Sequence, residues 1–310
     1  MATRLFGLRF AERHGLALHH PDARAWEVSD AGGRHVGLFV GDYFARPSKR
    51  SGAWMSALRG QRALGGQTRP IVLNVLNLAK GAAGGPALLS LDDARTLFHE
   101  FGHALHGLMS DVVYPSIAGT SVARDFVEFP SQLYEHWLLR PEILARFARH
   151  ATTGAPMPAP LIDRLLAARN FGQGFATVEY TASAIVDLEF HARPDIAGGD
   201  PMALEAQILA GIAMPAAIAM RHRTPHFAHV FSGEGYAAGY YSYLWSEVLD
   251  ADGFAAFEEA GDVFDPGLAG RLAAHVYAAG NRRDPAAAYR AFRGRDPQVG
   301  ALLRKRGFAP

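Results

Sequence analysis

The chain has 310 residues, of which 49% are hydrophobic and 20% are charged, so it can form a packed core and is not a mostly disordered chain. Basic and acidic residues number 31 and 30, and this balance does not favour a nucleic-acid-binding protein. There is no cysteine, which excludes disulfides, cysteine nucleophiles and thiolate metal sites.

The chain shows no sign of a membrane or secretory segment. No run of apolar residues approaches the roughly 18–20 that a membrane span needs. The first fifteen residues carry charges at Arg4, Arg9, Glu12 and Arg13, and they lack the long apolar region of a signal peptide. We therefore expect a cytoplasmic protein without a membrane partner.

The first ninety residues are predicted to mix strands and loops. Short β-rich runs at 26–28 and 35–40 flank the turn-rich segment 29–34, which predicts a hairpin. Residues 71–77 predict a third strand, which either offers a free edge to an extended peptide or lies inside the sheet. This group is too small to form a domain alone, so it is expected to pack on the rest of the chain.

Residues 91–310 are predicted to be mostly helical. From Leu91 to Leu108 apolar residues recur at helical spacing, and Asp92 and Asp93 favour a helix start. The same pattern predicts further helices at 126–140, 142–150, 161–168, 174–193, 202–212, 236–251 and 268–279. The sequence thus predicts a mainly α, α+β fold in a single domain over 1–310, with a small N-terminal β-sheet or hairpin region.

The first of these helices carries the spacing H-E-x-x-H. Residues four apart project from one face of a helix, so His99 and His103 can bind a single Zn²⁺. Glu100 is rotated by roughly 100° from His99. From there it can reach a metal-bound water and act as the general base of a hydrolase.

The third ligand has to come from elsewhere in the sequence. The three-histidine extension of the motif fails, because position 106 is His106 instead of glycine and position 109 is Met109 instead of histidine. His106 lies on a similar face to His99. We favour packing or hydrogen bonding near the site over direct ligation for this residue.

A carboxylate in the next predicted helix is a better candidate. Glu128 stands between apolar residues, where a metal would pair it well, although a surface glutamate fits the pattern about equally. Asp125 lies three residues earlier and is a candidate to support a metal-bound histidine. Pro130 marks either a kink or the start of the helix.

Three segments, 99–107, 124–132 and 229–245, resemble the M3 zinc oligopeptidases, and within that family the bacterial peptidyl-dipeptidases. Segments 3–8 and 51–55 are also similar, so the resemblance spans nearly the whole chain. It implies a helical catalytic domain of the HExxH zincin type with one Zn²⁺ per chain. The implied zinc ligands are His99, His103 and Glu128, and the implied general base is Glu100.

The resemblance also implies that His229, Tyr236 and Tyr243 are catalytic and hydrogen-bond to the oxyanion of the peptide. Without it, core packing is the favoured interpretation of the aromatic run 236–245. A peptidyl-dipeptidase must recognise a C-terminal carboxylate, which Arg221 or Arg223 could bind. Solvated arginines at a helix end are the more common alternative.

The implied activity is that of a zinc metallopeptidase that releases C-terminal dipeptides from short peptides. The alternatives are an endopeptidase that resembles oligopeptidase A, and a truncated fragment that binds zinc and peptide with little turnover. The chain resembles only the C-terminal half of the family, so we expect the N-terminal lobe to be absent. An exposed apolar face should then favour self-association or pairing with a separately encoded N-terminal half.

Overall fold

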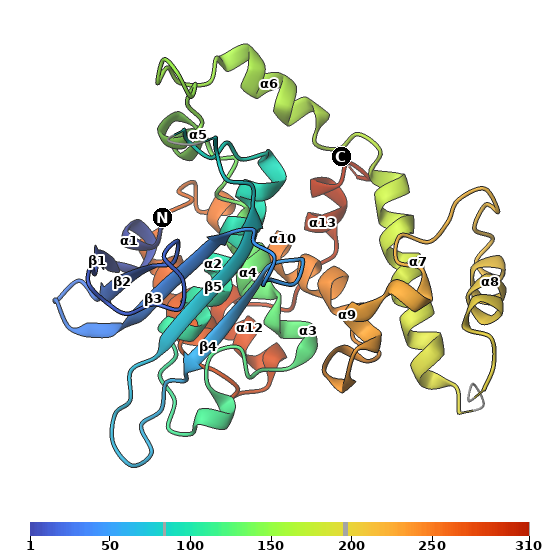
Figure 1. Cartoon of the computed structure of the whole chain (residues 1–310), viewed down its shortest axis with the longest axis horizontal. Coiled ribbons are helices and arrows are strands. Elements are labelled where there is room, and N and C mark those ends of the chain that lie inside the picture. Colours follow the sequence, from blue (N-terminus) through green and yellow to red (C-terminus); the bar gives the residue numbers. More distant parts are fainter. Residues whose placement is uncertain (83–84, 195–197, 310) are drawn as a thin grey trace.

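The computed structural model describes residues 1–82, 85–194 and 198–309, and it contains one small sheet and many helices (Figure 1). The sheet has the order β1-β2-β3-β5-β4. Its strands are β1 (Arg9–Glu12), β2 (Arg24–Ser29), β3 (His35–Phe44), β4 (Trp54–Arg59) and β5 (Ile71–Leu78). The predicted α+β fold, the β2–β3 hairpin and strand β5 are confirmed, whereas β1 and β4 were missed.

Strand β5 lies inside the sheet. It pairs parallel to β3 and antiparallel to β4, so the free edge considered for residues 71–77 is wrong. The free edges belong to β1 and β4. The sequence did not reveal β4 because its six residues include Ser56 and Arg59, which dilute the pattern typical of a strand.

Helix α2 (Leu91–Leu108) has the predicted bounds and a clear structural reason to begin where it does. The Ser90 hydroxyl accepts a hydrogen bond from the Asp93 amide at 3.0 Å, and the Asp93 carboxylate accepts one from the Ser90 amide at 2.9 Å. This capping box satisfies two free amides at the helix start. The C-terminal half of α2 is buried, with Leu105 and Leu108 almost fully enclosed.

The single helix predicted over 126–140 is divided in the structure. Helix α3 (Arg124–Val127) ends before Glu128, and α4 (Phe129–Glu135) follows directly. Pro130 sits in the first turn of α4, where its missing amide N–H costs no hydrogen bond. Pro130 therefore marks a helix start.

Helices α2 and α4 approach each other closely at Gly102. A Cβ atom at this position would lie 2.6 Å from Cα of Ser131 and 3.0 Å from the carbonyl oxygen of Pro130. Only glycine leaves room for this backbone contact. The contact brings the start of α4, and Glu128 just before it, against the face of α2 that carries the two histidines.

The other helices surround this pair. They are α1 (Ala2–Phe6), α5 (Pro141–Phe147), α6 (Ala159–Ala168), α7 (Gln173–Ala192), α8 (Pro201–Gly211), α9 (Ala228–Phe231), α10 (Ser242–Glu259), α11 (Pro266–Leu272), α12 (Pro285–Arg293) and α13 (Gly300–Lys305). Figure 1 shows α7 and α8 as an arm that projects from the main body. No described helix is long and apolar enough to cross a membrane.

Two predicted helices differ from the structure. The helix expected over 236–251 begins only at Ser242, and Tyr236 instead ends a short 3-10 turn, Glu234–Tyr236. The helix expected over 268–279 starts with α11 and continues as a π-helical turn, Ala273–Tyr277. Three glycines between 233 and 239 explain the late start of α10, because glycine disfavours helix.

One hydrophobic core joins the N-terminal sheet region to the helices. The sheet contributes Val28, Phe39 and Val72, and the helices contribute residues such as Leu105 and Phe129. Because the two regions share these contacts, the sheet packs on the helical part as expected.

Candidate metal and peptidase site

The structure brings the three predicted metal ligands together. Nε2 of His103 lies 3.1 Å from Oε2 of Glu128, and Nε2 of His99 lies 3.2 Å from the same oxygen. One ligand atom from each residue lies within 4.8 Å of the other two. The close crossing at Gly102 produces this arrangement, because Glu128 immediately precedes α4.

The chemistry of these donors fits zinc. Burial by itself would raise the pKa of Glu128, but the imidazoles of His103 and His99 outweigh it and hold that pKa well below its usual range. The carboxylate is therefore ionised. Two imidazoles and one carboxylate are a common ligand set of catalytic zinc, which keeps a further position for water or substrate.

A residue that the sequence analysis missed orients the first histidine. Nδ1 of His99 lies 2.7 Å from Oε1 of Glu135, at the end of α4. This contact fixes the His99 ring so that Nε2 faces Glu128. Glu135 stands seven residues after Glu128, a spacing of about two helical turns. This spacing was the one sequence feature that could have indicated that both glutamates face the histidines of α2.

The contact predicted for Asp125 is not found. Its carboxylate accepts a hydrogen bond from the Tyr241 hydroxyl at 3.3 Å, and its carbonyl oxygen accepts one from Ser246 at 3.0 Å. Glu135 makes the contact with a ligand histidine instead. The prediction assumed one continuous helix over 126–140. Asp125 instead belongs to the separate short helix α3, which ends before Glu128.

Glu100 is buried beside the two histidines. The residue is 5% exposed, and its Oε2 atom has no hydrogen-bond partner in the described part of the chain. Burial raises the pKa of Glu100 above its usual value, partly offset by His99 and His103. A buried carboxylate with a free oxygen and a raised pKa suits a general base.

His106 is fully buried, about two helical turns after His99 on α2. Neither ring nitrogen has a hydrogen-bond partner among the residues described, and the ring packs edge-on against Tyr277 with centroids 6.2 Å apart. Burial lowers the pKa of His106 to about 3, with a smaller contribution from His103. The geometry thus favours packing as the role of His106. The hydrogen bond that the sequence analysis also considered is not formed among the described residues.

The predicted catalytic residues of the C-terminal part also lie together. The hydroxyl of Tyr243 lies 3.1 Å from Nε2 of His229, and the His229 ring meets the Tyr236 ring edge-on with centroids 4.6 Å apart. Arg124 of α3 stacks over the Tyr236 ring at 4.1 Å and donates a hydrogen bond to the carbonyl oxygen of Gly235 at 2.7 Å. Sequence reasoning had given Arg124 no such role.

This aromatic group lies within the electrostatic reach of the metal ligands. Burial raises the pKa of Tyr243 far above its usual value, and the Glu128 carboxylate adds to the increase. The Tyr243 hydroxyl therefore keeps its proton at neutral pH. On α4, the Gln132 amide donates a hydrogen bond to the Tyr243 carbonyl oxygen at 3.2 Å, which links the two groups of residues directly.

The two candidate arginines for a substrate carboxylate face the arm. Nε of Arg223 lies 2.8 Å from the buried Glu205 carboxylate of α8, and NH1 of Arg221 lies 3.8 Å from Glu179 of α7. Arg223 is therefore engaged in a close ion pair. Arg221 has the looser contact and a side chain that is 55% exposed, so it is more available to a substrate.

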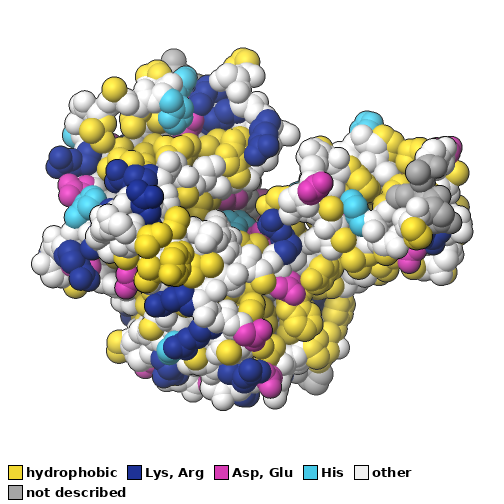
Figure 2. Space-filling model, turned by 90° about the horizontal axis from the view of Figure 1, so that it is seen from below, with side chains coloured by type: hydrophobic (Ala, Val, Ile, Leu, Met, Phe, Trp, Pro, Cys, Tyr) yellow, Lys and Arg dark blue, Asp and Glu magenta, His cyan; other side chains and the backbone are white. Residues whose placement is uncertain are grey.

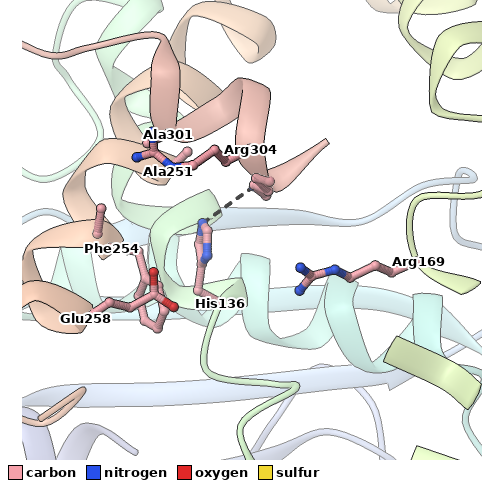
Figure 3. A pocket seen from close by; sticks show the side chains of 9 residues that line it. His136, Arg169, Ala251, Phe254, Glu258, Ala301 and Arg304 are labelled. Atoms are coloured by element: carbon pink, nitrogen blue, oxygen red, sulfur yellow. Dashed lines mark hydrogen bonds between the residues drawn. The ribbon is translucent and has the colours of Figure 1, made fainter. Parts of the chain in front are cut away.

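The residue after Glu135 is anchored from the opposite side. Nε2 of His136 lies 2.5 Å from the buried Asp250 carboxylate of α10, which also pairs with Lys305 of α13 at 3.0 Å. His136 lines a pocket of about 210 Å³, drawn in Figure 3, and its Nε2 lies 3.4 Å from Nζ of Lys305. These contacts fix the end of α4 and hence the position of Glu135.

A larger apolar groove lies beside the first half of α2. It has a volume of about 980 Å³ and is lined by residues of α2, α5 and α6, such as Phe98 and Phe147, and by the segment before α2, which includes Leu88. Leu88 and Phe147 are 71% and 65% exposed. Figure 2 shows hydrophobic side chains along the surface of the main body and a hollow between this body and the projecting arm.

The chain is similar to known peptidases over nearly its whole length. Residues 1–308 match the model of peptidase family M3. The chain belongs to this family. It is 44% identical to dipeptidyl carboxypeptidase of Escherichia coli K12 and 43% identical to that of Salmonella typhimurium LT2, in each case over 99% of this chain and 45% of the relative. Oligopeptidase A of Escherichia coli K12 is 38% identical with the same coverage.

These matches confirm the predicted resemblance and its bias towards peptidyl-dipeptidases. The identity to the two dipeptidyl carboxypeptidases exceeds the identity to oligopeptidase A. The chain spans less than half the length of these relatives.

Proposed function

We propose that this chain is the zinc-binding catalytic part of a metallopeptidase that releases dipeptides from the C-termini of short peptides. The observation that carries the proposal is the cluster of His99, His103 and Glu128 ligand atoms within 4.8 Å of one another, next to the buried carboxylate of Glu100. Dipeptide release is inferred from the higher identity to dipeptidyl carboxypeptidases.

His99, His103 and Glu128 would hold one zinc ion. When bound, zinc supplies a water of lowered pKa and polarises the scissile carbonyl group. Glu100 would accept the proton of the attacking water on its carboxylate and return it to the leaving amine. Its burial excludes competing water and raises its pKa towards the value that a base needs.

The aromatic group would stabilise the negative charge that develops on the peptide oxygen. Tyr243 retains its proton and can donate a hydrogen bond, while His229 at 3.1 Å fixes the direction of its hydroxyl. Tyr236 is held beside this pair by the stacking of Arg124. These residues bind the transition state more strongly than the planar substrate, which is the requirement for catalysis.

The peptide itself would bind in extended form along β4, because β4 has a free edge and packs beside the motif helix. Methyl Cε of Met55 in β4 lies 3.2 Å from where a Cβ of Gly107 would be. Main-chain hydrogen bonds to such an edge give affinity without side-chain preference. Arg221 would bind the C-terminal carboxylate, since its pairing with Glu179 is loose.

Mass spectrometry of an N-acylated pentapeptide, incubated with the zinc-loaded chain, tests the activity. Stepwise loss of C-terminal dipeptides, absent with Glu100→Gln, is the expected result. Internal cleavage of a C-terminally amidated peptide would favour the oligopeptidase A-like alternative. Zinc binding without any cleavage would favour the fragment with little turnover.

The apolar groove supports the proposal that another polypeptide covers part of this surface. Its exposed leucine and phenylalanine side chains resemble the lining of an interface more than a water-facing surface. We propose pairing with an N-terminal half or self-association. Light scattering at high concentration measures this, and a clean monomer would count against self-association.

A further inference from the structure

A buried carboxylate on the arm holds the backbone of the tyrosine-bearing segment. Asp187 of α7 is fully enclosed, and its Oδ1 accepts a hydrogen bond from the Ala238 amide at 3.0 Å. Its Oδ2 accepts a second one from the Tyr240 amide at 2.8 Å. Nδ1 of His191 on the same helix lies 2.8 Å from Oδ1. The two amides lie in the six-residue stretch between Tyr236 and Tyr243.

The backbone that Asp187 holds is in an unfavourable conformation. Ala238 has φ = 54°, in the left-handed region that alanine rarely adopts. Such a conformation persists only where its surroundings impose it. The paired hydrogen bonds from one carboxylate to the amides on both sides of Gly239 provide this constraint.

A second residue of α7 also contacts Tyr240. The Tyr180 hydroxyl donates a hydrogen bond to the carbonyl oxygen of Tyr240, and the two rings stack with centroids 5.0 Å apart. The amide and the carbonyl group of Tyr240 are thus both bonded to α7. The arm and the tyrosine-bearing segment are joined by backbone hydrogen bonds and not only by packing.

We propose that Asp187 is a positioning residue of the peptidase reaction, which sets the placement of Tyr236 and Tyr243 through the backbone of residues 238–240. The inference rests on the proposed function. A carboxylate is required because it accepts from both amides at once. An asparagine side chain at this position could accept from only one of them, since its NH₂ group would face the second donor. Asp187→Asn should therefore release one of the two contacts.

The coupling gives the arm a role in the reaction. Because α7 belongs to the arm, any displacement of α7 also moves the backbone between the two tyrosines. The hydroxyls of Tyr236 and Tyr243 act only when they are placed on the developing oxyanion, and a small misplacement there has a large effect on rate.

Hydrogen exchange of the backbone amides tests the contact without reference to activity. In the zinc-loaded chain, Asp187→Asn is expected to accelerate exchange at Ala238 or Tyr240 by at least about tenfold, because a hydrogen-bond acceptor is lost. Asp252→Asn is the matched control. Asp252 is also buried and bonds Tyr289 and Arg295 instead of the tyrosine-bearing segment, so exchange at 238 and 240 should not change.

Kinetics on the pentapeptide test the role in catalysis. Asp187→Asn is expected to lower kcat by about tenfold to a hundredfold, with zinc content unchanged and KM changed less than kcat. In a Tyr236→Phe background the same substitution should lower kcat by a smaller factor than it does in the wild-type chain, because the part of its effect that passes through the Tyr236 hydroxyl is already lost. A merely structural role would give additive effects.

Unchanged exchange together with an unchanged kcat in Asp187→Asn would overturn the proposal, as would full additivity with Tyr236→Phe. If Asp187→Asn does not fold, Tyr180→Phe serves instead, since it removes one hydroxyl and keeps the stacked ring. It should accelerate exchange around Tyr240 and lower kcat in the same direction. If the wild-type chain cleaves no peptide, the proposed function fails, while the exchange measurement still decides the contact.

Discussion

The metal-binding side and the tyrosine-bearing side of the site are built in different ways. His99 and His103 stand on α2, and Glu128 immediately precedes α4. These two helices cross in backbone contact at Gly102 and contribute to the main core. His229 and Tyr236 stand on a four-residue helix and a 3-10 turn outside the main core. Tyr236 packs on a small separate cluster, and hydrogen bonds from Arg124 to Gly235 and from the Tyr240 amide to Asp187 hold the neighbouring backbone.

The positions of the zinc ligands are thus fixed mainly by core packing, whereas the backbone of the tyrosine-bearing segment depends on a few hydrogen bonds. The zinc ligands cannot move without breaking the core, because close-packed interiors resist deformation. The tyrosine-bearing segment can move with the arm, as residues that close over substrates commonly do. Substitutions on the first side should therefore change metal binding, whereas those on the second should change rate with metal binding intact.

The largest effect is expected for His103→Ala. It removes a zinc ligand from the packed side, so the chain should lose both zinc and hydrolysis. Metal analysis after dialysis measures the first, and the pentapeptide assay measures the second. Added zinc should also no longer raise the melting temperature, because a ligand stabilises only the state that binds it. Retention of one tightly bound zinc would contradict the ligand assignment.

Glu100→Gln should separate metal binding from chemistry on this same side. Zinc content is expected to stay at one per chain, while kcat falls by about 10²- to 10⁴-fold through loss of the general base. Because burial raises the pKa of Glu100 above 4.5, wild-type kcat/KM should fall as the pH drops through that raised value. Residual activity of the variant should lack this acid limb, and near-normal activity would refute the assignment.

Tyr243→Phe tests the tyrosine-bearing side. It removes one hydrogen-bond donor to the oxyanion, so we expect kcat to fall by about 10²- to 10³-fold with zinc content unchanged. Tyr114→Phe is a suitable control because Tyr114 is exposed and lies outside the site. A loss of zinc in Tyr243→Phe would show that the two sides are not independent.

A smaller effect is expected for Glu135→Gln. Without the carboxylate on Nδ1, the His99 ring is less firmly oriented, and zinc affinity should fall by about tenfold to a hundredfold. A competition titration with a zinc-binding dye measures this change. The control is Glu142→Gln, an exposed glutamate at the start of α5, which should bind zinc as the wild type does.

Much of the packed side was accessible from the sequence. The apolar spacing and the acidic start of α2 gave its bounds, and H-E-x-x-H placed two histidines and a glutamate on it. Glu128 could be selected only through the family resemblance, because the sequence does not show that Gly102 admits α4. Glu135 was missed for the same reason, since it meets His99 across 36 residues of sequence.

The tyrosine-bearing side was less accessible. The helix predicted over 236–251 begins too early, because the glycines between 233 and 239 disfavour helix and hydrogen bonds to α7, which have no local signal, hold this segment in another conformation. Asp187 lies 51 residues before Ala238, the first of the two residues whose amides it binds. Such long-range contacts between an arm helix and a loop have no local signal in a single sequence.

The most direct test of the metal site is a zinc titration of the wild-type chain and Glu128→Ala, followed by calorimetry. Glu128 is the ligand that depends on the crossing of α2 and α4, so it tests the packed geometry itself. We predict one zinc per wild-type chain and an affinity loss in the variant greater than the roughly hundredfold upper value for Glu135→Gln. Equal affinity and stoichiometry in the two proteins would contradict the site described above.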